Sequence, residues 1–476
     1  MTNLSGANLN NGAAVGPQGE GMDSPSTFPK YPAYKDSGVE WLGDVPGHWN
    51  ISPLKFSASC NDTVLPDSTD GDYEIEYVEI SDVNEISGIT GSTSYKFADA
   101  PSRARRMLQD GDVLVSTVRT YLRAIAPVVA PPENLIASTG FAVVRPRKGI
   151  LDGAFLGYML RAEWWISEVI ARSVGVSYPA INASDLIGLN VPVPAWHEQT
   201  QIARFLDHET ARIDALIEEQ QRLIELLKEK RQAVISHAVT KGLDPTVPMK
   251  DSGLEWLGEV PAHWHVVAIK WLSPVLRGAS PRPIDDPKYF DDSGEYAWVR
   301  IADVSASDGT LRETTQTLSA LGASLSVKME PGEMFLSIAG TVGKPCITQI
   351  KACIHDGFVY FPSLSIDNKF LYRIFEVGTC YGGLGKMGTQ LNLNTETVGG
   401  IQIGVPPNSE IAQILEFIDR QSSAFDSLIG EAARGVELLQ ERRSALISAA
   451  VTGKIDVRGW QPPASASSPE LVQEAV

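Results

Sequence analysis

Residues Lys35-Asp-Ser-Gly-Val-Glu-Trp-Leu-Gly-Asp-Val-Pro-Gly-His-Trp49 return as Lys250-Asp-Ser-Gly-Leu-Glu-Trp-Leu-Gly-Glu-Val-Pro-Ala-His-Trp264. Twelve of the fifteen positions are identical, and the others exchange Val for Leu, Asp for Glu and Gly for Ala. A second matched pair follows, because Lys228–Asp244 (KEKRQAVISHAVTKGLD) resembles Gln440–Asp456 (QERRSALISAAVTGKID). Two pairs in the same order indicate a tandem duplication, in which each half carries the same framework.

Length and composition are those of a globular protein. A chain of 476 residues predicts about two to four domains, and 43% apolar with 21% charged residues is ordinary for such domains. No apolar run approaches the roughly 18 residues that cross a bilayer, and the first residues lack the pattern of a secretory signal. The four cysteines form no Cys-x-x-Cys pair, which predicts free thiols and no metal site. We therefore expect a cytoplasmic protein without membrane contact.

The net charge of −18 bears on which partners are expected. Proteins that bind nucleic acid alone are usually basic, because neutralising phosphates drives their affinity. An acidic chain that binds DNA needs local basic patches, or positive charge supplied by a partner.

Each half shows the same order of elements. Short β-type runs punctuated by Gly and Pro come first, and a long helix with apolar residues spaced by three and four follows Pro194 or Pro406. The predicted divisions are a disordered arm (1–27), a first mixed α/β domain (28–196), a first helix (197–242), a second such domain (243–407), a second helix (408–456) and a flexible tail (457–476).

The apolar spacing of the two helices predicts a seam between them. The positions that define it are Ile202, Phe205/Leu206, Ile213, Leu216/Ile217, Leu223, Leu226/Leu227 and Val234 in the first helix, with Ile414, Phe417/Ile418, Phe425, Leu428/Ile429, Val436, Leu438/Leu439 and Leu446 in the second. Such a seam favours an antiparallel coiled coil, and the alternative is that each helix packs on its own domain. If the halves are equivalent, Asp456 lies near Lys35, and the fold is α+β with pseudo-twofold symmetry.

These repeated strings resemble the specificity subunit of a type I restriction–modification system. The resemblance rests on Glu-Trp-Leu-Gly-x-Val-Pro-x-His-Trp, on the paired helix starts Gln201–Asp207 and Gln413–Asp419, and on the paired helix ends, and it covers about residues 30 to 458. It implies two target-recognition domains that each read half of an interrupted double-stranded DNA sequence. It also implies that the helices set the gap and dock two methyltransferase subunits, and that restriction subunits join them. S-adenosylmethionine, ATP and Mg²⁺ then belong to those partners.

Motifs for catalysis by the chain itself are incomplete. Gly340-Thr-Val-Gly-Lys-Pro345 lacks the first Gly and the final hydroxyl of a phosphate-binding loop. His48 and His263 hold matched places beside the repeated tryptophans, which favours packing over chemistry. The resemblance likewise implies a chain without catalytic residues, cofactor or metal of its own.

Candidate DNA contacts are polar and basic residues in loops that differ between the halves. Arg pairs with guanine and Asn or Gln with adenine, whereas phosphate contacts only position a protein. In the first domain the candidates are Arg103, Arg105, Arg106, Ser116, Arg119, Tyr121, Arg123, Ser177 and Tyr178. In the second domain they are Arg282, Arg300, Ser337, Thr341, Lys344, Lys386, Gln390 and Asn392. The alternative for each is an ordinary solvated loop residue.

Two other functions stay open on the sequence alone. The chain is a scaffold that assembles a multisubunit DNA-processing complex without reading bases, or it is an enzyme with an unrecognised site. An interrupted methylated motif that depends on the chain distinguishes a DNA reader from both.

Overall fold

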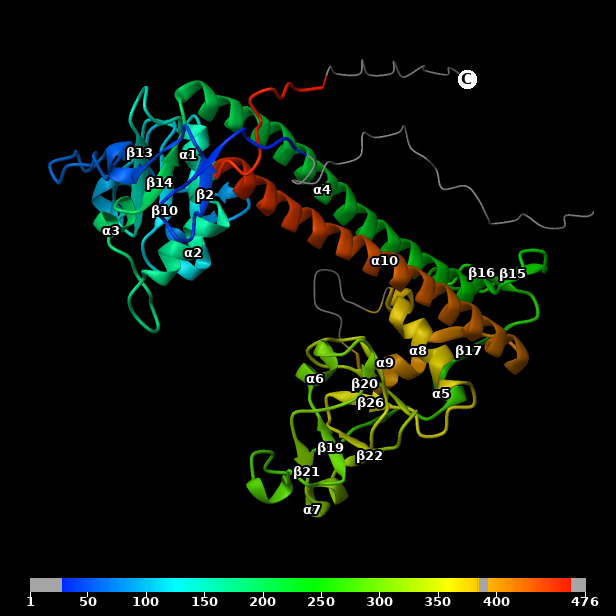
Figure 1. The fold of residues 1–476 in the computed structure, drawn as a ribbon. Helices are drawn as coiled ribbons and strands as arrows, with labels where there is room; N and C mark the ends of the chain where they lie inside the picture. The colour runs from blue at the N-terminus through cyan, green and yellow to red at the C-terminus, as the bar shows by residue number, and fades with distance from the viewer. Residues whose placement is uncertain (1–27, 383, 385–392, 464–476) are drawn as a thin grey trace, which may run out of the picture. The chain divides into compact units, whose positions relative to one another are not determined.

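The computed structural model describes residues 28–382, 384 and 393–463. The chain divides into two compact units, residues 1–220 with 434–476 and residues 221–433. Each unit therefore contains one mixed α/β domain, part of each long helix and one copy of the repeated segment (Figure 1). No helix of the described residues is long and apolar enough to cross a membrane.

Two four-stranded sheets form the domain of the first unit. The first sheet is antiparallel, in the order β11 (Ile125–Pro127), β10 (Val113–Ser116), β13 (Phe141–Pro146) and β4 (Ala58–Cys60). The second is mixed, in the order β8 (Thr93–Lys96), β5 (Glu74–Val78), β12 (Leu135–Ser138) and β9 (Ala104–Met107). A small hairpin and three helices complete the domain: β6 (Val83–Asn84), β7 (Gly88–Ile89), α1 (Gly153–Leu160), α2 (Glu163–Ala171) and α3 (Ala183–Ile187).

The second unit repeats this plan. One sheet has the order β18 (Leu276–Arg277), β26 (Phe358–Tyr360), β23 (Met334–Ser337), β24 (Pro345–Thr348) and β20 (Thr310–Leu311). The other has the order β21 (Thr317–Leu318), β19 (Tyr296–Val299), β25 (Ala352–Ile354) and β22 (Val327–Met329). Its helices are α5 (Ile269–Leu272), α6 (Ile301–Ala306), α7 (Ala320–Ser324), α8 (Asn368–Val377) and α9 (Thr395–Gly400). The pairing of β19 with β25 is parallel, as is that of β5 with β12.

The long helices are α4 (Trp196–Lys241) and α10 (Asn408–Val451). In the first unit Asp214 of α4 accepts a hydrogen bond from Arg443 of α10 at 2.8 Å, and in the second unit Asp426 of α10 pairs with Arg231 of α4 at 2.5 Å. Together with the contacts at their ends, these pairs make the helices antiparallel in each unit. The predicted fold class, with mixed α/β domains and two long antiparallel helices, is confirmed.

Part of the predicted seam is wrong. Four leucines assigned to it are between two fifths and two thirds exposed: Leu223, Leu226, Leu428 and Leu438. An α-helix has about 3.6 residues per turn, so a stripe chosen by alternating steps of three and four drifts around a long helix. The fully buried seam positions lie near the ends of the helices, where the globular domains also pack, such as Ile202 and Ile414.

The repeated segment forms the same junction in each unit. Its first part is a hairpin, β1 (Tyr34–Asp36) with β2 (Asp44–Pro46) or β15 (Met249–Asp251) with β16 (Glu259–Pro261). The strand after it pairs with the strand before the long helix, β3 (Asn50–Pro53) with β14 (Asn190–Val193) and β17 (His265–Ala268) with β27 (Gln402–Val405). The repeat is thus the place where each domain meets the start of a helix.

A carboxylate in the first turn of each helix binds this junction. Glu198 accepts hydrogen bonds from the indole of Trp49 (3.0 Å) and pairs with His48 (2.9 Å). Glu410 makes the matching contacts with Trp264 (3.0 Å) and with the imidazole of His263 (2.7 Å). The matched histidines therefore have a structural role, as the repeat predicted.

The end of the opposite helix completes each junction. Gly242 directly follows α4 with φ +75°, and Gly453 follows the end of α10 with φ +72°, the left-handed conformation that closes many helices. Their neighbouring lysines donate to equivalent carbonyl oxygens of the hairpins, Lys241 to Glu259 and Lys454 to Asp44. The order is Lys-Gly in one copy and Gly-Lys in the other. Even so, each copy has a left-handed glycine after the helix and a lysine bound to the same hairpin carbonyl.

The C-terminal segment lies beside the first repeat, as equivalence of the halves predicted. Asp456 N–H donates to the carbonyl of Pro29 (2.7 Å), and the Tyr34 hydroxyl donates to that of Gly453 (3.1 Å). Residues 457–460, which the predicted divisions included in the flexible tail, pack on α4: Val457 is buried, and Trp460 contacts Phe205. The predicted arm (1–27) and the end of the predicted tail (464–476) lie outside the described residues.

Candidate nucleic-acid interface

The loop after β10 in the first unit is fixed by three contacts. Ser116 N–H donates to Ala124 O (2.9 Å), and Thr117 N–H donates to Gly140 O (2.9 Å). The Ser116 hydroxyl is buried and donates to Val118 O (2.7 Å), so this candidate supports the loop from within. These contacts anchor the loop at the end of a buried strand.

Arg119 is at the exposed end of this loop. Its φ is +51°, a left-handed conformation that costs a residue with a side chain about 1–2 kcal/mol. Its guanidinium lies 4.8 Å from the ring centroid of Tyr178, and its N–H donates to Pro179 O (2.8 Å). Tyr178 and its neighbour Ser177 are exposed. Two candidate loops are thus joined, and an arginine is stacked with its planar fork at the surface, which suits bidentate contact with a base.

The second arginine of the loop has a different environment. Arg123 also has a positive φ, but its guanidinium pairs with Glu163 (2.7 Å) and with Glu85 (3.1 Å). Arg119 forms no ion pair with a carboxylate of the described residues. Tyr121, between them, is half exposed. Arg119 is therefore the cation that this loop leaves available.

The basic cluster at the start of β9, Arg103 with Arg105 and Arg106, lies next to the same loop. Arg103 is exposed, and its carbonyl accepts from Thr139, the residue before the glycine that holds the loop. Arg105 pairs with Asp67 at 3.5 Å, and Arg106 is half-buried. Of these three candidates, Arg103 is the exposed one.

The second unit contains an equivalent loop after β23. Ser337 N–H donates to Lys344 O (3.0 Å), and Ile338 N–H donates to Gly357 O (2.9 Å). The buried Ser337 hydroxyl donates to Ala339 O (2.8 Å). These are the three contacts of the first loop, made by residues at corresponding positions.

The position that corresponds to Arg119 is Gly340. Its φ is +64°, and an added Cβ would lie 2.6 Å from a methyl carbon of Ile301, so a side chain does not fit there. Thr341 is exposed beside it. The Lys344 ammonium donates to carbonyl oxygens of α6 and of the residue after it (3.0 and 2.7 Å), which ties this candidate to the domain. The two loops share a backbone and differ in the chemistry that they expose.

The remaining described candidates of the second unit are arginines. Arg282 pairs with Asp356 (3.1 Å), whose pKa is lowered by the hydrogen bond from the Ser280 hydroxyl. Arg300 is the N-cap residue immediately before α6, and its N–H donates to the side chain of Asp303 (2.8 Å). Glu79 has this place in the first unit, so a basic residue in one half corresponds to an acidic residue in the other. Lys386, Gln390 and Asn392 lie outside the described residues.

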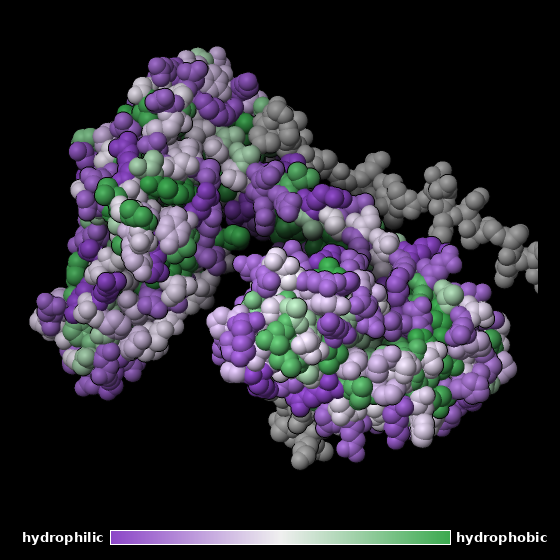
Figure 2. All heavy atoms as spheres, turned by 90° about the horizontal axis from the view of Figure 1, so that it is seen from below, coloured by the Kyte–Doolittle hydropathy of each residue, from purple (hydrophilic) through white to green (hydrophobic). Residues whose placement is uncertain are grey.

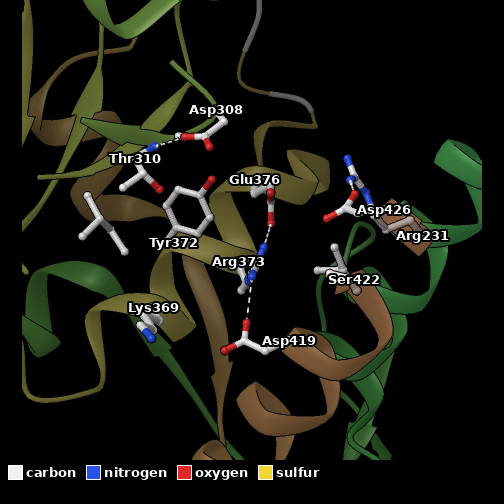
Figure 3. Close-up of a pocket in the computed structure, with 13 residues that line it drawn as sticks. Arg231, Asp308, Thr310, Lys369, Tyr372, Arg373, Glu376, Asp419, Ser422 and Asp426 are labelled. Atoms are coloured by element: carbon white, nitrogen blue, oxygen red, sulfur yellow. Dashed lines mark hydrogen bonds and ion pairs between the residues drawn. The ribbon is translucent and has the colours of Figure 1, made fainter. Parts of the chain in front are cut away.

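A cavity of about 510 Å³ lies in the second unit between α8, α4, α10 and the loop at Asp308 (Figure 3). Arg373 of α8 crosses it to pair with Glu376 (2.8 Å) and with Asp419 of α10 (2.9 Å). In the first unit Tyr158 of α1 makes the matching contact with Asp207 (2.8 Å). The charges around the cavity fasten the domain to the helices, and no group of three His, Cys, Asp or Glu in the described residues could hold a metal ion.

Sequence reasoning did not single out Glu198 and Glu410, which organise the junctions. Each follows the closing proline of its domain by four residues, Pro194 and Pro406. Comparison of the two halves at this offset would have found them. The ion pairs of Arg123 give no such signal, because Glu163 and Glu85 lie about 40 residues away in the chain.

Residues 56–227 match the family model of the type I restriction modification DNA specificity domain. A putative specificity subunit of the MjaX type I restriction enzyme from Methanocaldococcus jannaschii is 25% identical over 431 residues, which are 88% of this chain and 96% of that protein. The HindI specificity subunit from Haemophilus influenzae is also 25% identical, over 75% of this chain and 89% of its own length.

Two solved structures share the fold. A chain from work on complex assembly and conformational transition of the type I R-M system has a TM-score of 0.69 at 21% identity, over 86% of this chain and 98% of that chain. The HsdS subunit from Thermoanaerobacter tengcongensis has a TM-score of 0.52 at 20% identity, with the same coverage.

Proposed function

We propose that the chain is a specificity subunit of a type I restriction–modification system and that it reads the DNA target of that system; the matched family model and the similar proteins and structures support this. One observation carries the proposal: two loops with the same backbone contacts expose Arg119 in one domain and Gly340 in the other. Two domains that read different DNA sequences need the same loop backbone and different residues at the exposed end of the loop. Each domain accordingly reads one half of an interrupted, bipartite sequence.

The two long helices set the distance between the half-sites in this proposal, and they dock two methyltransferase subunits. Restriction subunits then join the complex, which methylates adenine or cleaves DNA. Support for docking comes from four exposed leucines on the two long helices: Leu223, Leu226, Leu428 and Leu438. Isolated exposed leucines are ordinary, but several on two helices favour a protein partner.

We assign no catalytic step to this chain. S-adenosylmethionine, ATP and Mg²⁺ act in the partner subunits, and the chain supplies position and sequence choice. Its acidity fits this division, because a net charge of −18 opposes tight binding to DNA by the chain alone. We expect weak DNA binding by the isolated chain, and tight, selective binding by the complex with methyltransferase subunits.

The scaffold alternative is less well supported than DNA reading. The matched family model describes a DNA specificity domain, and a scaffold without base contacts gives no reason for Arg119 to hold a left-handed conformation. Outliers of this kind collect at functional sites, because the surrounding structure must sustain their strain.

Sequencing of methylated adenines in the host tests the proposal. We expect one interrupted motif with two specific parts, and its loss when the gene for this chain is deleted. A contiguous motif, or a bipartite motif that survives the deletion, would contradict the proposed function.

A further inference from the structure

Each unit exposes a lysine followed by a large aromatic residue at the same place in the duplication. Lys55–Phe56 lies six residues beyond Trp49, and Lys270–Trp271 lies six residues beyond Trp264. Phe56 is 61% exposed and Trp271 is 78% exposed. In both pairs the lysine ammonium lies over the neighbouring ring, at 5.5 and 5.7 Å from its centroid.

The backbone around both pairs is the same and is well anchored. Each pair is part of a single helical turn, Leu54–Phe56 or α5. The residue that begins the turn is fully buried. Its N–H donates to the carbonyl of the residue just before the last strand of the domain, Leu54 to Leu189 O and Ile269 to Ile401 O, both at 2.9 Å. The exposed rings are therefore held on fixed supports.

Both pairs lie away from the candidate reading loops. In the first unit β13 pairs with the loop-bearing strand at Phe141, whereas its other end, Pro146, pairs with Ala58, two residues beyond Phe56. Five residue steps at about 3.3 Å each separate the two ends. The duplicated pair thus faces a different region from the loops that differ.

The second unit has the same separation. β26 pairs with the loop-bearing strand at Phe358, and the chain beyond β26 reaches Ser365, whose N–H donates to Leu272 O at 3.0 Å. Leu272 directly follows Trp271 in α5. In Figure 1, α5 lies beside β17, whereas α6, which borders the reading loop, lies at another side of the domain.

Exposure alone does not mark these residues, since apolar groups are scattered over the visible surface of the molecule (Figure 2). Their duplication does. A surface that has the same chemistry in both halves, where the reading loops differ, fits one occupant present in two copies. Exposed aromatic side chains are also the residue type that most often dominates protein–protein binding.

We propose that Lys55–Phe56 and Lys270–Trp271 are two equivalent anchors for one protein partner, the methyltransferase subunit, which binds one copy to each half. The ring fills an apolar socket of the partner, and the lysine meets carboxylates at the rim of that socket. This inference rests on the proposed function, and it adds docking residues on the globular domains to the helices.

Binding of the methyltransferase subunit of the same system, measured by titration and native mass spectrometry, tests the anchors. We expect two copies on the unaltered chain. Phe56→Ala and Trp271→Ala each weaken one site by roughly 30-fold, the equivalent of about 2 kcal/mol at a binding hot spot. The double variant weakens both sites, whereas Phe56→Trp, which copies the second anchor into the first, keeps both.

Val129→Ala is the matched control, because Val129 is 78% exposed in the first unit outside the duplicated surface. All variants are expected to keep the melting temperature, since the altered rings are exposed. Two copies bound with unchanged affinity to the double variant would overturn the anchors and leave the proposed function standing. Reduced DNA affinity of the complex with unchanged methyltransferase binding would overturn them in favour of a DNA contact. An unaltered chain that binds no methyltransferase subunit would overturn both proposals.

Discussion

The loop after β10 and the loop after β23 are closed by the same three contacts, yet Arg119 in the first corresponds to Gly340 in the second. The two junctions differ far less: His, Trp and Glu recur with bond lengths within 0.2 Å of each other. Duplication has kept the chemistry where domain meets helix and changed it at the loop tips. The junctions hold each domain on its helices, and the loop tips distinguish the two halves.

Alanine at the two helix-ending glycines should separate the junctions most strongly. An added Cβ at Gly453 would lie 2.3 Å from a ring carbon of Pro46, whereas at Gly242 the nearest atom is the flexible carboxylate of Glu410 at 3.1 Å. Gly453→Ala is expected to lower the free energy of unfolding by about 3 kcal/mol and Gly242→Ala by about 1–2 kcal/mol. Urea unfolding followed by tryptophan fluorescence measures both, and equal losses would contradict the comparison.

Removal of the junction carboxylates should give the next largest effect. The side chain of Glu198 is 1% exposed and that of Glu410 is 23% exposed. Water can therefore replace the lost carboxylate at the indole of Trp264 more easily than at the indole of Trp49. We expect Glu198→Ala to cost about 2–3 kcal/mol and Glu410→Ala about 1 kcal/mol. Glu416→Ala on the exposed face of α10 is the control in thermal unfolding. A larger loss at Glu410 would reverse the assignment.

Arg119→Gly should make the first loop like the second. Relief of the left-handed strain exceeds the added entropy of glycine in the unfolded chain, so the free energy of unfolding is expected to rise by about 0.5–1 kcal/mol. Chemical denaturation of this variant beside Arg123→Gly, whose ion pairs are lost as well, provides the measurement. Destabilisation by Arg119→Gly would show that the stacked guanidinium holds the loop instead of serving a ligand.

The duplicated ion pairs should matter least. Asp214→Ala and Asp426→Ala each remove one exposed helix–helix pair, with Arg443 and Arg231 respectively. Exposed pairs contribute about 0–1 kcal/mol, and salt screens them. We expect melting temperatures within about 3 °C of the unaltered chain, with the difference vanishing in 1 M salt. A large drop for one variant only would mean that the two pairs are not equivalent.

The sequence predicted the features of the fold that occur in both halves of the duplication. Matched strings located the junctions, the two helices and the approach of the C-terminal segment to the first repeat, because a repeated string implies a repeated environment. It misassigned Leu223, Leu226, Leu428 and Leu438, since spacing alone does not follow the drift of a stripe around a long helix. It also placed residues 457–460 in a tail. In the structure one valine and one tryptophan are enough to pack this polar segment on α4.

The sequence located loops that carry polar and basic residues, but it did not show the environment of the individual side chains. Ser116 and Ser337 fell in the candidate sets, but their hydroxyls bond the backbone of their own loops. Arg123 and Lys344 are engaged by distant acids and carbonyls that no local pattern reveals. The left-handed conformation of Arg119 was likewise invisible, because an arginine is not the residue that such a position usually has.

The central claim is that each domain reads its own half of the target, and methylome sequencing of a host that carries Arg119→Ala tests it most directly. We predict that one half of the bipartite motif becomes relaxed, by roughly 1–3 kcal/mol of discrimination at a base, while the other half and the gap stay unchanged. Equal weakening of methylation across all sites, or relaxation of both halves together, would contradict the claim.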